Sequence, residues 1–368
     1  MKKKRFWGIV SLCAILVGLI IVSLILVLYY TGHPGLKTVI QREEIDIENP
    51  ITEIEIEATF SDVKIVTISE KAGSVRYGGP KAEKLYCERT YQDGKLTIKQ
   101  VDARKWYEKI MINHQAEQEC EIVLYLPQGV SYQSLKIKTS SGDVFVPHEG
   151  VVKKSHSISF NEVSVETSSG DIDFSAGLAI TGVSYGGASF KTSSGDVRLQ
   201  GVRNAPLRVE TSTGDITLIN SEFEGGLSLA TSTGEVQLSH VTLAQSDSVY
   251  LKSDTGDISF HEVTAGSVKM ESNSGDVELT SVLLTGELRI ETDTGDVEIE
   301  RSDAGSLWIE TDTGDVEVEL LTGKTYFVES DTGRVKHPPQ DRDGGQCRVE
   351  TDTGDVKITL FSDRHHDD

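Results

Sequence analysis

Residues 290–299 read Ile-Glu-Thr-Asp-Thr-Gly-Asp-Val-Glu-Ile, and this block decides the fold because the chain repeats it. Eleven related blocks share the pattern Ser/Thr-x-Ser/Thr-Gly-Asp-Val/Ile, and the spacing between their glycines settles near 20 residues in the later copies. The glycines are Gly142, Gly170, Gly195, Gly214, Gly234, Gly256, Gly275, Gly295, Gly314, Gly333 and Gly354. A fixed period of this length is the mark of a repeat architecture.

The residues on both sides of each glycine alternate between apolar and polar. The side chains five and seven positions before it are apolar, as at Ile290 and Leu288, and Val or Ile stands two positions after it, as at Val297. Charged residues such as Glu291 and Glu298 take the positions between. A period of two predicts strands with one face buried, and glycine flanked by Ser, Thr and Asp is typical of a tight turn.

The same residue type in the same slot of every copy favours a stack over a sandwich or a barrel, because each repeat then buries its apolar face against its neighbours. The fold class that we predict is all-β, a parallel β-helix or solenoid of about eleven rungs. Arg334 and His337 depart from the pattern in the tenth block, and Pro338-Pro339 follow, which predicts an irregularity near the C-terminal end. The short polar stretch 361–368 offers little to cap that end of the stack.

An N-terminal transmembrane helix is expected to precede the solenoid. Residues 6–30 are 25 residues without a charge, enough to cross the hydrocarbon core, and aromatic residues stand at both ends. Lys2 to Arg5 are basic, which predicts a cytoplasmic N-terminus and an extracytoplasmic C-terminal part at the cell membrane. The alternative is a cleaved signal peptide, but the apolar run is long for one and no Ala-x-Ala-like site follows it.

The predicted organisation of the chain has six parts. They are a cytoplasmic tail (1–5), a transmembrane anchor (6–30), a linker (31–36), a strand-rich capping region (37–130), the β-solenoid repeats (131–360) and a polar tail (361–368). Within the capping region, residues 61–65 (Ser-Asp-Val-Lys-Ile) resemble the later repeat without its glycine.

The four cysteines do not form a disulfide framework. Cys13 falls in the apolar segment, without the small residue expected just before a lipoprotein cysteine. Cys87 and Cys120 could form one bridge, and the alternative of two free thiols stays open. Cys347 stands seven positions before Gly354, in an inward apolar slot, so we expect a core residue and not a reactive one.

The formal net charge of −22 excludes nucleic acid as a natural partner, since nucleic acids are polyanions. An acidic body is compatible with cationic partners, and otherwise serves solubility. The acidic turns also form a candidate metal site, a Ca²⁺ ladder of carboxylates from successive rungs. Its residues are Asp293, Asp296, Asp312, Asp315, Asp352 and Asp355. The alternative is that each Asp caps its own turn, and the spacing matches neither known calcium loop.

No catalytic or cofactor-binding residues emerge from the pattern. The sequence shows no Ser/His/Asp order, no phosphate loop and no zinc spacing, and its many paired carboxylates arise from repetition. His365 and His366 stand in the polar tail and do not indicate a metal site by themselves. We therefore expect a protein that is not an enzyme.

With the repeat established, the chain resembles the bacterial "putative adhesin" family of β-strand repeats, a domain class of unknown function. Block 290–299 carries the resemblance, together with the lead-in Leu-Tyr-Leu-Pro-Gln-Gly at 124–129, and it covers roughly residues 50–360. The resemblance implies a right-handed parallel β-helix-like fold at the cell envelope, and it supplies no catalytic residues.

Two functions follow as expectations. The first is a membrane-anchored, extracytoplasmic, adhesin-like binding or structural protein of the bacterial cell envelope, with an unknown envelope or surface partner. The second is an accessory component of envelope-stress sensing that acts through a membrane partner, because a cytoplasmic tail of five residues cannot itself carry a signal.

Overall fold

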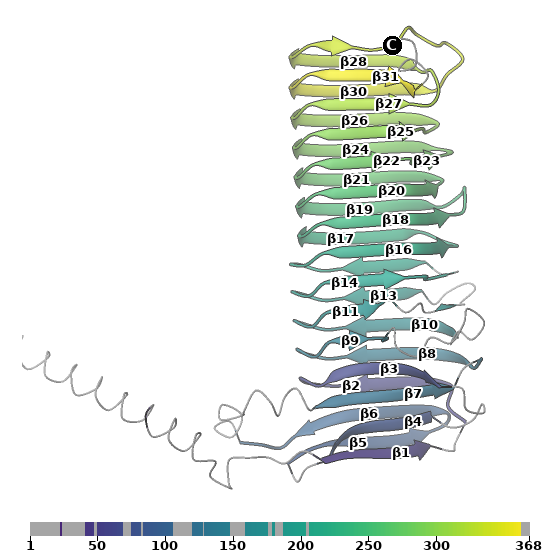
Figure 1. Cartoon of the computed structure of the whole chain (residues 1–368), viewed down its shortest axis with the longest axis vertical. Coiled ribbons are helices and arrows are strands. Elements are labelled where there is room, and N and C mark those ends of the chain that lie inside the picture. The colour runs from purple at the N-terminus through teal and green to yellow at the C-terminus, as the bar shows by residue number, and fades with distance from the viewer. Residues whose placement is uncertain are drawn as a thin grey trace, which may run out of the picture.

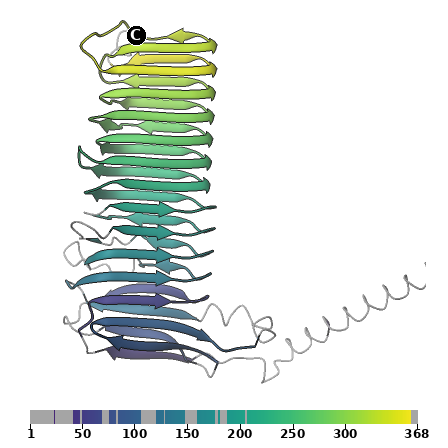
Figure 2. The same ribbon diagram turned by 180° about the vertical axis from the view of Figure 1, so that it is seen from behind.

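The computed structural model describes residues 41–47, 50–68, 75–81, 84–105, 120–127, 129–147, 159–175, 179–180, 187–203 and 206–361, together with Ser23. These residues form one tall stack of strands, with the N-terminal strands at one end and the C-terminal ones at the other (Figures 1 and 2). Within this part of the chain, no helix has the length and apolar character needed to cross a bilayer. The predicted anchor at 6–30 lies outside the described residues except for Ser23.

Each rung contains one strand before the turn and one after it, and both run parallel to their counterparts in the next rung. The strands before the turn are β2 (Glu53–Glu57), β8 (Ser131–Lys138), β10 (Ser159–Glu166), β13 (Ala188–Lys191), β15 (Leu207–Glu210), β17 (Leu227–Thr233), β19 (Ser248–Thr255), β21 (Ser267–Ser274), β24 (Glu287–Thr294), β26 (Ser306–Thr313), β28 (Thr325–Thr332) and β30 (Gln346–Thr353). The strands after it are β3 (Asp62–Ile68), β9 (Val144–Phe145), β11 (Ile172–Phe174), β14 (Val197–Gln200), β16 (Ile216–Phe223), β18 (Val236–Leu243), β20 (Ile258–Ala265), β22 (Val277–Thr280), β25 (Val297–Ser302), β27 (Val316–Leu320), β29 (Val335–Lys336) and β31 (Val356–Leu360). Two short strands, β12 (Ala179–Ile180) and β23 (Leu283–Leu284), also belong to the stack.

The register places like residues on like. Leu288 pairs with Leu307, Ile290 with Ile309 and Thr292 with Thr311, so the inward slots form continuous columns. Ile290 is fully buried and Val297 is 1% exposed, in agreement with the predicted inward positions. These columns merge into one hydrophobic core that runs the length of the described stack. The prediction of an all-β fold with parallel strands stacked as a solenoid is confirmed.

The turn glycines stack directly on one another. A Cβ added to Gly275 would lie 2.3 Å from the carbonyl oxygen of Gly256, and one added to Gly295 would lie 2.1 Å from that of Gly275. Real Cβ atoms essentially never come this close, so only glycine allows the turns to pack at the spacing of the strands. Gly142 makes the same contact with the carbonyl oxygen of Ser61, which confirms that residues 61–65 are a copy of the repeat.

The Ser/Thr column three positions before the glycine holds the turns together only in part of the stack. The Thr192 hydroxyl accepts a hydrogen bond from the Gly195 amide (3.1 Å) and donates one to the Gly170 carbonyl (3.1 Å). In four successive rungs the corresponding hydroxyl groups are buried without a hydrogen-bond partner in the described part of the chain. These are the hydroxyl groups of Ser253, Ser272, Thr292 and Thr311. In the last two blocks Ser330 and Thr351 again donate to glycine carbonyl groups.

A second bend lies six residues after the turn glycine. There the backbone takes a left-handed conformation, which is uncommon in residues other than glycine. The column consists of Gly201, Asn220, His240, Glu262, Ser281 and Arg301, with φ between 47° and 68°. Side chains at this bend therefore project from equivalent positions on successive rungs.

The N-terminal end is closed by strands that pair mostly antiparallel. These are β1 (Gln41–Ile47), β4 (Val75–Lys81), β5 (Leu85–Gln92), β6 (Lys95–Asp102) and β7 (Glu121–Pro127). β1 pairs with β4, β4 with β7 and β5 with β6 in antiparallel fashion. β6 and β7 in turn stack in parallel on β2 and β3, so the cap is continuous with the rungs.

The strand order at the C-terminal end differs from the chain order. β30 pairs with both β26 and β28, and β31 with both β27 and β29. The last rung of the sequence thus lies between the ninth and the tenth, and the tenth rung, β28 with β29, is outermost (Figure 1). The Gln340 side chain accepts from the Tyr326 amide (2.7 Å) and donates to the Tyr326 carbonyl (2.9 Å), as a paired strand would. The sequence predicted little to cap the C-terminal end of the stack. In the structure this end is covered by the irregular tenth rung with its Pro338-Pro339 loop.

None of the three cysteines outside the predicted anchor, Cys87, Cys120 and Cys347, forms a disulfide. For Cys87 and Cys120 the open alternative therefore resolves to two thiols. Cys347 is 0% exposed and its pKa is raised to about 12 by burial, which confirms the expected core position.

Candidate functional site

Asp residues that directly follow the turn glycines form a ladder of hydrogen bonds along the stack, and Glu235 and Arg334 take this position in two of the rungs. A carboxylate oxygen of Asp276 accepts from the backbone amide of Asp296 (2.8 Å), Asp296 from Asp315 (2.8 Å) and Asp315 from Asp355 (2.7 Å). At the end of the ladder Asp355 accepts from the amide and the guanidinium group of Arg334, and these bonds hold the pKa of its carboxyl below the usual value. Each of these Asp residues caps the turn of a neighbouring rung.

The other column of the predicted Ca²⁺ ladder stands two positions before the glycine. Asp293, Asp312 and Asp352 are exposed at the edge of the turns. Among the described residues, none of the six predicted ligands belongs to a group of three His, Cys, Asp or Glu side chains whose ligand atoms lie within 4.8 Å of one another. One carboxylate oxygen of Asp296 and one of Asp315 already bind backbone amides. The Ca²⁺ ladder stays a prediction.

An open groove of about 700 Å³ crosses the outer face of the strands before the turn. Its floor is built from small residues of successive rungs, among them Gly187, Ala188, Gly226 and Ser228. Most outward slots there hold small residues, such as Ser164, Ser189 and Ser228, and the longer outward side chains that line the groove are Glu162, Arg208 and Tyr250. The remaining lining residues are Val163, Pro206, Leu207, Leu227 and Ser248.

Tyr250 and Arg208 are the large side chains that border the groove. Tyr250 is 39% exposed, and its hydroxyl donates to a Glu271 carboxylate oxygen (3.1 Å). Partial burial and this hydrogen bond raise the pKa of Tyr250, while Lys269 holds the pKa of Glu271 below its usual value. Arg208 pairs with Glu210 in its own strand. The groove therefore presents an aromatic ring and a guanidinium group beside several hydroxyl groups.

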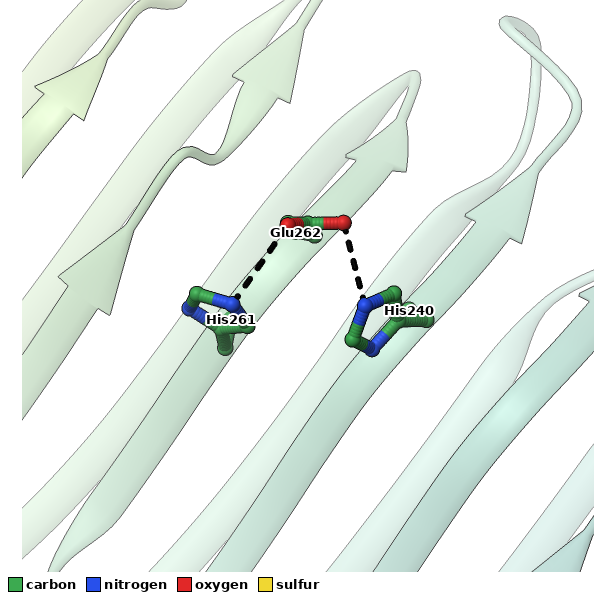
Figure 3. A group of neighbouring side chains, drawn as sticks. All are labelled: His240, His261 and Glu262. Atoms are coloured by element: carbon green, nitrogen blue, oxygen red, sulfur yellow. Dashed lines mark ion pairs between the residues drawn. The ribbon is translucent and has the colours of Figure 1, made fainter.

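A second cluster lies at the left-handed bend on the strands after the turn. His240 of β18 and His261 and Glu262 of β20 point toward one another (Figure 3). His240 Nε2 lies 3.2 Å from Glu262 Oε2, and His261 Nε2 lies 3.5 Å from Glu262 Oε1. The three side chains are about half exposed.

Neither the groove nor this cluster was predicted from the sequence. A signal for the cluster was present, because His240 and Glu262 both follow their turn glycines by six residues. An alignment that extended beyond the apolar slot at position four would have placed them in one column. The groove had a weaker signal, the run of Ser and Gly in outward slots of neighbouring blocks.

Three solved structures are similar to this chain at low sequence identity. A putative adhesin from Bacteroides fragilis is 12% identical, with a TM-score of 0.30, over 87% of this chain and 97% of that one. A putative lipid binding protein from Parabacteroides distasonis is 15% identical, with a TM-score of 0.37, over 86% and 97% of the two chains. A putative cell adhesion protein from Clostridium sporogenes is 9% identical, with a TM-score of 0.18, over 87% and 99%. These scores are too low for a conclusion about function.

The family itself is identified from the sequence. No curated protein matches the chain. The family model described as Toastrack DUF4097, a domain of unknown function, matches residues 51–247 and 240–366. This match covers the solenoid and most of its N-terminal cap, and it bears out the resemblance drawn from block 290–299. The chain belongs to the Toastrack DUF4097 family.

Proposed function

We propose that this protein is an adhesin-like binding and structural protein of the bacterial cell envelope. In this proposal residues 6–30 anchor it in the cell membrane with the N-terminus in the cytoplasm and the solenoid outside. The uncharged run of 25 residues and the basic residues Lys2 to Arg5 support the anchor and its orientation. The proposal includes a right-handed winding of about eleven rungs.

The groove at Tyr250 and Arg208 is the observation that carries the binding role. Its floor spans several rungs, so it suits a long partner that lies along the stack. Aromatic rings and hydroxyl groups recognise sugars, and Tyr250 stands beside the hydroxyl groups of Ser228 and Ser248. The net charge of −22 favours a partner that carries positive groups. We therefore propose a glycan of the envelope with free amino groups as the partner.

We further propose that the protein binds this partner without chemical conversion. The polar groups of the groove are serine hydroxyls, the Tyr250 phenol, the Arg208 guanidinium group and the Glu162 carboxylate, all on an open surface. General acid–base catalysis gains from groups held away from bulk water, and this open surface does not provide that setting.

A cosedimentation experiment tests the groove. The full-length protein in detergent is incubated with purified envelope glycan, and bound protein is measured for the wild type, Tyr250→Ala and Ser228→Lys. The first variant removes the aromatic ring and the second fills the floor, so we expect binding at least about 10-fold weaker in both, a loss of about 1.4 kcal/mol. Lys357→Ala is the matched control, because Lys357 lies on the strands after the turn and pairs with Glu317 there.

The outcome separates the two functions that the sequence predicts. Equal binding by all variants, or no binding by the wild type, would overturn the proposed role of the groove. Cross-linking in cells through a photoreactive residue at position 228 then identifies the partner directly. Capture of a sensor kinase or a transporter in place of glycan would favour the accessory role in stress sensing.

A further inference from the structure

The cluster of His240, His261 and Glu262 unites residues that bind divalent transition metals. Imidazole nitrogen and carboxylate oxygen are ligands of Zn²⁺ and of related divalent transition metals, and three protein ligands leave positions open for water or another donor. Among the described residues this is the group in which three such atoms lie within 4.8 Å of one another. The cluster lies on strands β18 and β20, which do not line the groove, so metal binding there does not depend on the proposed glycan binding.

The distances in the cluster suit a single ion. Two ligand atoms that each lie 2.0–2.1 Å from a tetrahedral zinc are about 3.3 Å apart. Glu262 Oε2 lies 3.2 Å from His240 Nε2 and Glu262 Oε1 lies 3.5 Å from His261 Nε2, so each imidazole has one carboxylate oxygen at about this distance. The imidazole rings are T-shaped with centroids 5.7 Å apart, and both side chains are half exposed, so a small rotation brings the third pair of atoms closer.

The backbone brings the ligands together at a rigid position. His240 and Glu262 occupy the left-handed bend of adjacent rungs, with φ of 55° and 52°, and strand pairing holds these rungs in register on both sides of the bend. Every rung of this region has the bend, so the conformation is a property of the fold and not of the cluster. Its effect is to aim the two side chains from equivalent positions. The adjacent members of the column, Asn220 and Ser281, carry no charge that would compete with a cation.

Ser239 orients one of the ligands. Its Oγ lies 2.8 Å from His240 Nδ1, and the direction of this hydrogen bond depends on the tautomer of the imidazole. When Nδ1–H donates to the serine oxygen, the lone pair of Nε2 is available to a cation that lies between His240 and Glu262. Metal-binding histidines commonly donate their second ring N–H in this way, which fixes the tautomer.

We propose that His240, His261 and Glu262 form a surface site for a divalent transition metal of the zinc class, with Ser239 as a positioning residue. The ion binds both Nε2 atoms and the carboxylate, and its remaining positions face solvent. It links rungs β18 and β20 by coordination in addition to their backbone hydrogen bonds. Binding displaces any proton held on Nε2 into solvent, since only the neutral imidazole with a free lone pair is a ligand.

The test uses the full-length protein in detergent, stripped with chelator, in which His365→Ala and His366→Ala remove the tail histidines. Zn²⁺ is titrated by calorimetry, and Co²⁺ is titrated while its visible absorption reports the ligands. We expect one saturable site per chain, an affinity more than about 10-fold lower in His240→Asn and Glu262→Gln, and about 10-fold lower in Ser239→Ala. Asparagine tolerates the left-handed bend, so the first variant tests the ligand and not the fold.

His337→Ala is the matched control, because His337 stacks on Tyr326 in the cap and lies outside the cluster. Circular dichroism without metal establishes that each variant is folded. Retention of the site in His337→Ala together with its loss in His240→Asn supports the proposal. It is overturned if the stripped wild type shows no saturable binding, or if the ligand variants bind Zn²⁺ as tightly as the wild type.

Discussion

Replacement of Gly275 by alanine tests the column of turn glycines most directly. The added Cβ would lie 2.3 Å from the carbonyl oxygen of Gly256, and the φ of Gly275 is 137°, a conformation that side-chain-bearing residues rarely adopt. Overpacking typically costs about 1–3 kcal/mol. A strained backbone adds about 1–3 kcal/mol. We therefore expect a loss of about 4 kcal/mol, which lowers the melting temperature by roughly 5–10 °C in a chain of this size.

Two further substitutions separate the causes of this loss. Gly195→Ala places a Cβ 2.0 Å from the Gly170 carbonyl oxygen without a left-handed φ, so it measures the contact alone. Gly226→Ala meets only the Ser248 carbonyl oxygen at 3.7 Å, an ordinary contact, and serves as the control. We expect Gly195→Ala to lose about 1–3 kcal/mol from the contact and Gly226→Ala to stay within about 0.5 kcal/mol of the wild type.

The assay is thermal unfolding of the full-length variants in detergent, followed by circular dichroism. Repeat proteins can unfold in parts, so all variants are compared by the midpoint of the same transition. If Gly275→Ala melts within 1 °C of the wild type, or if Gly226→Ala is as destabilised as Gly275→Ala, the contact between stacked turns does not require glycine.

Four other measurements follow from the structure. Thr192→Val loses two hydrogen bonds and should lower the free energy of unfolding by about 1–2 kcal/mol. Thr292→Val removes a buried hydroxyl without a partner in the described part of the chain and should leave this free energy unchanged or raise it. Equal melting temperatures of the two variants would show that the hydrogen bonds of Thr192 do not stabilise the fold. Asp296→Ala removes the acceptor for the Asp315 amide and should lower the free energy of unfolding by about 1 kcal/mol, while Asp296→Asn keeps an acceptor and should lower it little. If Asp296→Asn were the less stable variant in urea unfolding, the hydrogen bond from the Asp315 amide would not stabilise the turn. Ca²⁺ should leave the melting temperature unchanged relative to chelator if these aspartates serve as caps, and a rise of several degrees would support the predicted ladder instead. Because burial raises the pKa of Cys347 to about 12, the folded thiol stays protonated at pH 8 and should resist alkylation until the protein unfolds. The contribution of the buried thiol to stability is complete below the unfolded pKa and is lost as the pH rises toward 12. Rapid alkylation of the folded protein at pH 8, measured by mass spectrometry, would contradict the core position of Cys347.

The repeat itself could be predicted because its signal is local. Ile290 and Val297 stand at fixed offsets from Gly295, and alternation along a strand is set by the geometry of a few neighbouring residues. Because the apolar side chains must be buried, residues at the same position of successive blocks stack on one another. The same reasoning identified the degenerate copy at Ser61 and the core position of Cys347.

The order of the last rungs could not be predicted, since like slots are interchangeable. Thr311 pairs with Thr351, but Ser330 in the skipped rung offers a nearly equivalent side chain. What distinguishes the two rungs is the loop after the tenth, where Gln340 pairs with the outer edge at Tyr326. That interaction depends on a three-dimensional return of the chain, which periodicity does not describe.

The candidate sites were missed for a related reason. His240 and Glu262 come together through the stacking of two rungs, and each is an unremarkable outward residue in its own block. The groove is a property of several outward slots that are small at the same time. Inward slots repeat under the constraint of packing, whereas outward slots vary freely, so a cluster of outward residues cannot be predicted from the period of the repeat.

The placement of the last rung between its two predecessors has an evolutionary consequence. β30 and β31 already have a neighbour on each side, so a copy of the repeat appended after Leu360 would find no open edge next to it. β2 and β3 are enclosed in the same way, between β6 and β7 on one side and β8 and β9 on the other. A gene encoding this architecture can lengthen its product by duplicating blocks in the interior, as the closely similar segments 290–299 and 309–318 illustrate. The strands at the two ends of the described stack form the closures, so duplication of interior blocks changes the length of the stack without disturbing them.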